Sequence, residues 1–195
     1  SYESEGSVST ATPPELVAAG SDYPARITER YLGLPDEFPQ RVRYTAVELA
    51  SDRDNAYEIA LGIQRFLQAI PYSTEVEAPP LGVDAVDWFL FENHVGFCNY
   101  YATAMITMLR SLGIPARLAI GFAPGTFIEE RGGWVVQAWN YHAWPEVYFP
   151  GYGWIEFEPT NPEIQPSLLH LERVTAPRTV VQLPESLFEV ECDAE

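Results

Sequence analysis

Hydrophobic residues recur with two different periods along this chain, and the period changes close to Pro115. Over residues 54–70, apolar side chains recur every three or four positions, which is typical of an amphipathic helix, and Pro71 then ends the pattern. Residues 98–112 are apolar on nearly every face, so we expect a helix that is buried on all sides. Gly113 should supply its left-handed cap. Beyond Pro115, the pattern predicts β-strands.

The second half of the chain should therefore form an antiparallel sheet. We expect strands at residues 117–122, 134–139, 142–149 and 152–158. Helices that precede an antiparallel sheet predict the α+β class, with the helix over residues 98–112 packed on the sheet. We divide the chain into a flexible arm at residues 1–20, one folded domain at 21–165 and an extension at 166–195 that wraps the core.

The last two expected strands should form a hairpin that brings a histidine and a carboxylate together. Its loop, residues 149–151, has glycine in the last position, where a three-residue loop needs left-handed backbone. In this register Tyr148 faces Tyr152, and His142 faces Glu158. Directly opposed residues have Cβ atoms about 5 Å apart, so the carboxylate of Glu158 is placed to hold the imidazole of His142.

Cys98 begins the buried helix, where free backbone N–H groups and the positive end of the helix dipole favour a thiolate. A free cysteine is more often a buried, inert residue. Here, however, a histidine that can accept the thiol proton and a carboxylate that can hold the histidine follow in the same chain. We interpret Cys98, His142 and Glu158 as a catalytic triad for acyl transfer.

Three neighbouring residues receive other interpretations. Glu146 lies on the same face as His142 but roughly 13 Å along the strand, too far away to orient the imidazole. Pro145 cannot donate to a ladder, and it indicates a bulge or an edge in its strand. His94 could suggest a metal site with Cys98 and His142, but no second pair of ligands at metal-binding spacing exists. We therefore predict no metal and no other cofactor.

Four ordered blocks of the sequence resemble the transglutaminase-like superfamily. They begin at Gly96, Leu109, His142 and Gly153, and they read GFC, LRSLGIPAR, HAWPEVY and GWIEFEPT. The upstream part, from Tyr31, resembles the extracytoplasmic domain of membrane-anchored bacterial members. The resemblance extends over most of the chain, to about residue 162, and it implies a papain-like, transglutaminase-like core.

The resemblance assigns one role to each member of the triad. Position by position, it makes Cys98 the nucleophile, His142 the base and Glu158 the third member. The chain departs from the family pattern in two places. The family usually has aspartate at the position of Glu158, and bacterial relatives commonly have an acidic residue followed by an aromatic residue or histidine where this chain has Asn99 and Tyr100.

Triad and resemblance together predict a thiol-dependent enzyme that transfers acyl groups from protein or peptide carboxamides. An amine acceptor gives cross-linking, whereas water gives deamidation, and the sequence leaves this choice open. One alternative is a cysteine peptidase or amidase of the cell exterior. Another is a non-catalytic peptide-binding module that keeps the fold.

Composition narrows the class of partners. The chain has 195 residues with 11 Lys and Arg against 28 Asp and Glu, a formal net charge of −17. This charge disfavours nucleic acids and anionic membrane surfaces, which bind basic patches. The resemblance to membrane-anchored bacterial members implies a domain outside the cytoplasm, in the periplasm or at the cell surface, tethered to a membrane only through segments outside this chain. We expect a monomer. Cys192 lies in an acidic tail, so we expect no disulfide.

Overall fold

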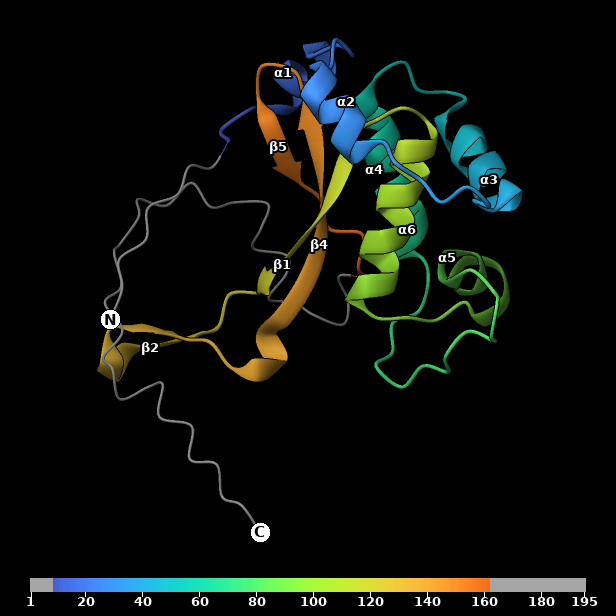
Figure 1. Cartoon of the computed structure of the whole chain (residues 1–195). Coiled ribbons are helices and arrows are strands. Elements are labelled where there is room, and N and C mark those ends of the chain that lie inside the picture. The colour runs from blue at the N-terminus through green and yellow to red at the C-terminus, as the bar shows by residue number, and fades with distance from the viewer. Residues whose placement is uncertain (1–8, 162–195) are drawn as a thin grey trace.

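The computed structural model describes residues 9–161, in which helices come first and the main sheet last (Figure 1). The α-helices are α1 (Pro13–Ala18), α2 (Ala25–Tyr31), α3 (Gln40–Ala50), α4 (Ala56–Gln68), α5 (Ala85–Trp88) and α6 (Cys98–Ser111). The strands are β1 (Ala116–Phe122), β2 (Thr126–Ile128), β3 (Gly133–Val135), β4 (Tyr141–Phe149) and β5 (Gly153–Glu156). This arrangement confirms the predicted α+β class. None of the helices in residues 9–161 is both long enough and apolar enough to cross a membrane.

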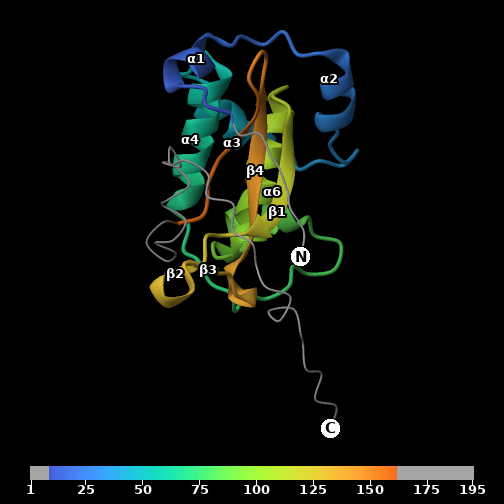
Figure 2. The same ribbon diagram turned by 90° about the vertical axis from the view of Figure 1, so that its left-hand side faces the viewer.

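Helix α6 lies at the centre of the core, with the sheet on one side and helices α3 and α4 on the other (Figures 1 and 2). At its C-terminal end, the N–H of Gly113 donates to the carbonyl of Arg110 and the N–H of Ile114 to that of Leu109, both at 3.0 Å. These two bonds close a Schellman cap. The predicted buried helix, its cap and its packing on the sheet are confirmed.

Strand β4 is the central strand of an antiparallel sheet with the order β1-β4-β5. Pro145 lies within this central strand and not at a bulge, but pairing with β5 stops at it, so on that side it marks the edge of the ladder. It faces Leu118 of β1 at a position where the β1–β4 ladder needs no N–H from β4. On the other side, Phe157 donates to the Pro145 carbonyl at 3.0 Å, but proline has no N–H to return. The β4–β5 ladder accordingly ends one pair earlier, at Glu146–Glu156.

The hairpin register differs by two residues from the predicted one. Tyr148 faces Trp154 instead of Tyr152, and the pair that closes the loop is Phe149–Gly153. The N–H of Tyr152 donates to the carbonyl of Phe149, with Gly151 in left-handed backbone as a type II turn requires. Gly153 also takes a left-handed conformation, at φ +82°, whereas the prediction assumed only one left-handed glycine in the loop. The second left-handed glycine lengthens the connection and shifts the register.

Two other segments differ from expectation. Residues 13–18, assigned to the flexible arm, form helix α1, because Thr12 and Glu15 make a capping box and Leu16 is buried in the core. Of the strand expected at residues 134–139, only the first part is extended, and it pairs with β2 in a separate two-stranded ribbon. The extension predicted at residues 166–195 lies outside the described residues. The division of the chain into arm, folded domain and extension stays a prediction.

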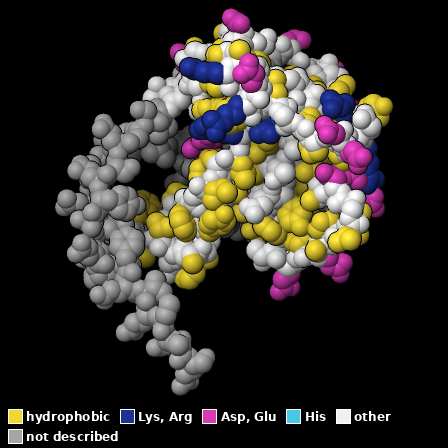
Figure 3. Space-filling model, in the orientation of Figure 1, with side chains coloured by type: hydrophobic (Ala, Val, Ile, Leu, Met, Phe, Trp, Pro, Cys, Tyr) yellow, Lys and Arg dark blue, Asp and Glu magenta, His cyan; other side chains and the backbone are white. Residues whose placement is uncertain are grey.

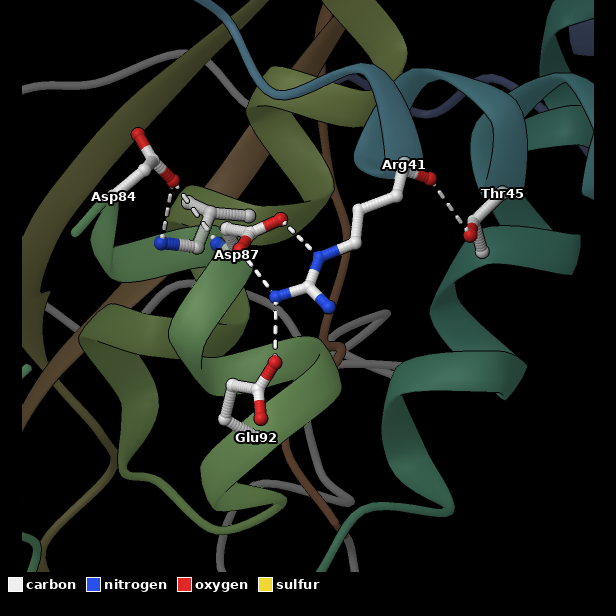
Figure 4. A network of polar contacts seen from close by, with 6 residues as sticks. Arg41, Thr45, Asp84, Asp87 and Glu92 are labelled. Carbon is white, nitrogen blue, oxygen red and sulfur yellow. Dashed lines mark hydrogen bonds and ion pairs between the residues drawn. The ribbon is translucent and has the colours of Figure 1, made fainter.

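A polar network fixes the chain just before the start of α6 (Figure 4). The guanidinium group of Arg41 on α3 binds both carboxylate oxygens of Asp87, at 2.6 and 2.5 Å, and reaches Glu92 at 2.8 Å. Asp84 caps α5 by accepting from the N–H groups of Val86 and Asp87. Helix α5 and the π-helix Phe89–Asn93 that follows it are thereby anchored to α3.

Candidate active site

Cys98 is the first residue of α6, and the residues before it are tightly constrained. Gly96 lies beside Pro71 and Ser73, with which its backbone exchanges hydrogen bonds. A Cβ atom at Gly96 would lie 2.8 Å from the ring of Phe89, so only glycine fits there. Cys98 itself is buried, and it forms no disulfide with any of the described residues. The helix start therefore holds the thiol in a fixed position.

His142 lies on β4, opposite Gly121 of β1, and is 2% exposed. Its Nε2 atom is 2.5 Å from Oε2 of Glu158. The ring of Trp144 stacks on the imidazole with ring centroids 6.0 Å apart, and it also covers Gly121, where a Cβ would lie 2.9 Å from the indole. Carboxylate and indole together fix the orientation of the imidazole, and they leave Nδ1 as the nitrogen that can exchange a proton with a thiol.

The electrostatic surroundings of His142 favour its charged form. Burial lowers the pKa of His142, but hydrogen bonds to Cys98 and Glu158 and the negative charge of both groups outweigh burial and raise the pKa to about 9. The structure thus brings the three predicted site residues together. An imidazolium that is stable at neutral pH is the partner that a thiolate needs.

Glu158 reaches His142 by a route that strand pairing did not predict. Because the β4–β5 ladder has ended, the backbone of Glu158 is held by helix α4. Its N–H donates to Oε1 of Gln64 at 3.1 Å, and its carbonyl accepts from Nε2 of Gln68 at 2.8 Å. The second carboxylate oxygen accepts from the N–H of Thr160 at 2.8 Å. Two amides one helical turn apart therefore clamp the residue that orients the histidine.

Sequence reasoning missed this pair of glutamines and also Tyr72. Burial raises the pKa of Tyr72, and negative charge on Cys98 and Glu158 raises it further, so the phenol lies within electrostatic reach of both groups. The only sequence signal for the glutamines was two amides four residues apart in a mostly apolar helix. Such a pair normally indicates a solvent-exposed face of a helix.

The other candidate residues lie elsewhere. Glu146 binds Arg117 across the β1–β4 ladder at 2.5 Å, away from the imidazole. His94 is exposed and adopts left-handed backbone at the end of the π-helix. In residues 9–161, no three His, Cys, Asp or Glu side chains are grouped so that they could hold a metal ion.

Comparisons with known proteins identify the family. The model of the family described as the transglutaminase-like superfamily matches residues 43–159. The uncharacterised protein YebA of Bacillus subtilis is 41% identical over 141 residues, which are 69% of this chain and 19% of YebA. A protein-glutamine gamma-glutamyltransferase of Pseudomonas aeruginosa is 37% identical over 149 residues, 75% of this chain and 22% of that protein.

A solved structure is similar over most of the described chain. The periplasmic domain of TgpA from Pseudomonas aeruginosa superimposes with a TM-score of 0.66 at 30% sequence identity, covering 78% of this chain and 52% of that domain. The chain spans about a fifth of the length of the two curated relatives.

Proposed function

Because the chain belongs to the transglutaminase-like superfamily, we propose that it transfers acyl groups from glutamine carboxamides of proteins or peptides through Cys98, His142 and Glu158. The observation that carries this proposal is the 2.5 Å contact between His142 and Glu158 beside a thiol at a helix start. The pKa of His142, raised by its contacts with Cys98 and Glu158, is consistent with an imidazolium that accompanies a thiolate.

The reaction begins with a thiolate and an imidazolium. The sulfur of Cys98 attacks the carboxamide carbon, a C–S bond forms, and the carbonyl electron pair moves to oxygen. Backbone N–H groups at the start of α6 donate to this oxyanion. As the C–N bond breaks, Nδ1 of His142 gives its proton to the leaving nitrogen, and ammonia departs from a thioester.

The second half of the reaction reverses these roles. Neutral His142 accepts a proton from an incoming amine, which attacks the thioester carbon, and the departing sulfur restores the thiolate. With an amine as acceptor the product is a cross-link, and with water it is a glutamate. The 37% identity to a gamma-glutamyltransferase favours the amine. The runner-up function is a cysteine peptidase or amidase, in which a peptide nitrogen leaves and water resolves the thioester.

We place this activity outside the cytoplasm, in a domain tethered to a membrane by segments outside this chain. The similarity to a periplasmic domain of TgpA supports the location. Labelling of Cys98 in intact cells by a membrane-impermeant maleimide tests it. Labelling only after the cells are broken would contradict it.

Turnover of a glutamine peptide tests the chemistry. We expect ammonia release from a blocked glutamine dipeptide and, with hydroxylamine as acceptor, formation of a hydroxamate. Cys98→Ala should abolish both products, while the control Cys192→Ala should keep them. Hydrolysis of the peptide backbone without ammonia release would favour the peptidase. The absence of any turnover that depends on Cys98 would favour a binding module.

A further inference from the structure

Strand β1 is an edge strand, and half of its backbone groups face away from the sheet. Its ladder to β4 includes bonds from Ala123 to Asn140 and from Tyr148 to Pro115, which fix the bonded series of pairs. Bonded and non-bonded pairs alternate in an antiparallel ladder. The N–H and C=O groups of residues 118, 120 and 122 therefore point outward, and residues 9–161 supply no strand that pairs with them.

The same three residues carry exposed apolar side chains. Leu118, Ile120 and Phe122 are 43%, 59% and 57% exposed. Natural edge strands are normally protected by charges, prolines or bulges. From residue 118 to residue 122, β1 has none of these. An unprotected edge with aligned donors, acceptors and apolar side chains has the features of a strand-binding surface.

The exposed edge is continuous with other apolar side chains and lies next to the candidate active site. Phe127 and Trp134 of the β2–β3 ribbon and Tyr141 of β4 are also about half exposed. Figure 3 shows hydrophobic side chains gathered over this part of the sheet. Gly121, between two of the outward-facing residues, is the direct partner of His142. A strand added to β1 would lie about 10 Å from β4, two strand spacings away.

We propose that the free edge of β1, at residues 118–122, binds an extended apolar segment of the polypeptide substrate as an additional strand. The inference rests on the proposed function, because it names the substrate class of that site. The segment that binds is one that flanks the reactive glutamine, and the glutamine itself reaches Cys98 from it. Chains with alternating apolar residues beside a glutamine would be preferred, since every second side chain then packs on the exposed face.

Charge favours a substrate segment over a second copy of this chain as the occupant. Each copy carries a formal net charge of −17, so two copies that join edge to edge repel one another. A neutral or basic peptide meets no such repulsion. The edge also lies beside His142, so a substrate strand bound there would lie close to the candidate active site.

One variant separates the edge from the rest of β1. Ile120→Pro removes an outward-facing N–H and leaves the β1–β4 ladder intact, because residue 120 does not bond to β4. We expect kcat/KM on a long peptide, with glutamine flanked by alternating valines, to fall about tenfold. On the blocked dipeptide it should be unchanged. Ile120→Thr is the control for loss of the apolar side chain, because it keeps the N–H. Val47→Thr makes a comparable loss at an exposed apolar residue of α3, away from the edge. Threonine replaces proline at Val47 because proline would break the helix.

Binding to the Cys98→Ala protein tests the edge independently of turnover. A fluorescent long peptide should bind. Two N-methylated series, one at odd and one at even positions of the peptide, should differ, because only alternate N–H groups of an added strand face β1. Binding should weaken in one series only. If the blocked dipeptide is not turned over but the peptide still binds in this manner, the proposed function fails and the edge proposal stands. Equal effects of both N-methylated series would overturn strand addition.

Three further outcomes would also overturn the proposal. The first is equal loss on both substrates with Ile120→Pro, which would place the defect in the site itself. The second is a large fall in melting temperature with Ile120→Thr but not with Val47→Thr, which would mean that another part of this chain covers the edge. The third is a concentration-dependent dimer that Ile120→Pro dissociates, which would make a second copy the occupant.

Discussion

Two pairs, each of a carboxylate with a basic side chain, have equal length, and they differ in the burial of the basic side chain. His142 and Glu158 are joined at 2.5 Å with side chains 2% and 17% exposed. Arg117 on β1 and Glu146, four positions from His142 along β4, are joined at the same distance with side chains 37% and 16% exposed, so only the basic member differs in burial. A histidine out of water responds to its partner by a change of protonation, whereas an arginine at the surface stays charged whatever its partner does. Burial and residue type are therefore our grounds for assigning the proposed chemistry to the His142–Glu158 pair.

The largest expected effect comes from breaking the buried pair. Glu158→Gln should lower the acyl-transfer rate on the order of a hundredfold or more, because a neutral amide neither stabilises the imidazolium nor fixes its tautomer. Glu158→Asp should keep the activity or raise it, since aspartate is the usual residue of the family. Glu146→Gln, the matched change in the Arg117–Glu146 pair, should leave the rate within about twofold. Steady-state turnover of the blocked dipeptide measures all three, and equal rates for wild type and Glu158→Gln would falsify the triad.

A smaller effect should follow from loosening the support of that pair. Gln64→Met and Gln68→Met each remove a hydrogen bond to the backbone of Glu158 while keeping the length of the side chain. We expect kcat to fall about tenfold with KM unchanged, because the orientation of Glu158 is lost and substrate binding is not. Gln40→Met, at the exposed start of α3, is the control. A fall in stability without a fall in kcat would reduce the glutamines to a structural role.

The protonation of His142 should appear in the pH dependence of stability. Its pKa in the folded protein is about 9, above the ordinary value of 6.5. The stabilisation is therefore complete below pH 6.5 and lost as pH rises towards 9. Urea midpoints at several pH values should fall across this window in the wild type and fall less in His142→Gln. A midpoint that rises with pH over the same window would contradict the sign of this shift.

The smallest expected effect is on stability and comes from breaking the Arg117–Glu146 pair. Arg117→Met should change the free energy of unfolding by about 1 kcal/mol or less, since the guanidinium is more than a third exposed and water and salt screen its charge. The residual cost includes loss of the guanidinium stacked 4.3 Å from the Trp154 ring centroid. Denaturation at low and high salt measures it. A cost several times larger would mean that the pair is not solvent-screened.

Some of the features behind these predictions could be predicted from the sequence, and others could not. The buried helix that starts at Cys98 and its cap were predictable, because apolar periodicity and a glycine before Ile114 and Pro115 are local signals. The contact between His142 and Glu158 was expected too, but from a register that is wrong by two residues.

The error in register arises within the hairpin, whereas the support of Glu158 is long-range. A ladder that ends because Pro145 has no N–H to return, and a second left-handed glycine at Gly153, together changed the path of the chain. The support of Glu158 by Gln64 and Gln68 joins residues about ninety positions apart. No periodicity in either segment indicates such a contact. The sequence therefore identified which side chains meet, and it missed what holds them.

The support from α4 also bears on the safety of the chain while it folds. A reactive thiol is a hazard in an unfinished protein, because it can be oxidised or can form disulfides with other chains. Here the imidazole of His142 comes from the sheet, and the backbone of Glu158 is held by a helix of the opposite layer. The three groups meet only after the two layers have docked. On the proposed function, the site is therefore complete only when the chain has finished folding.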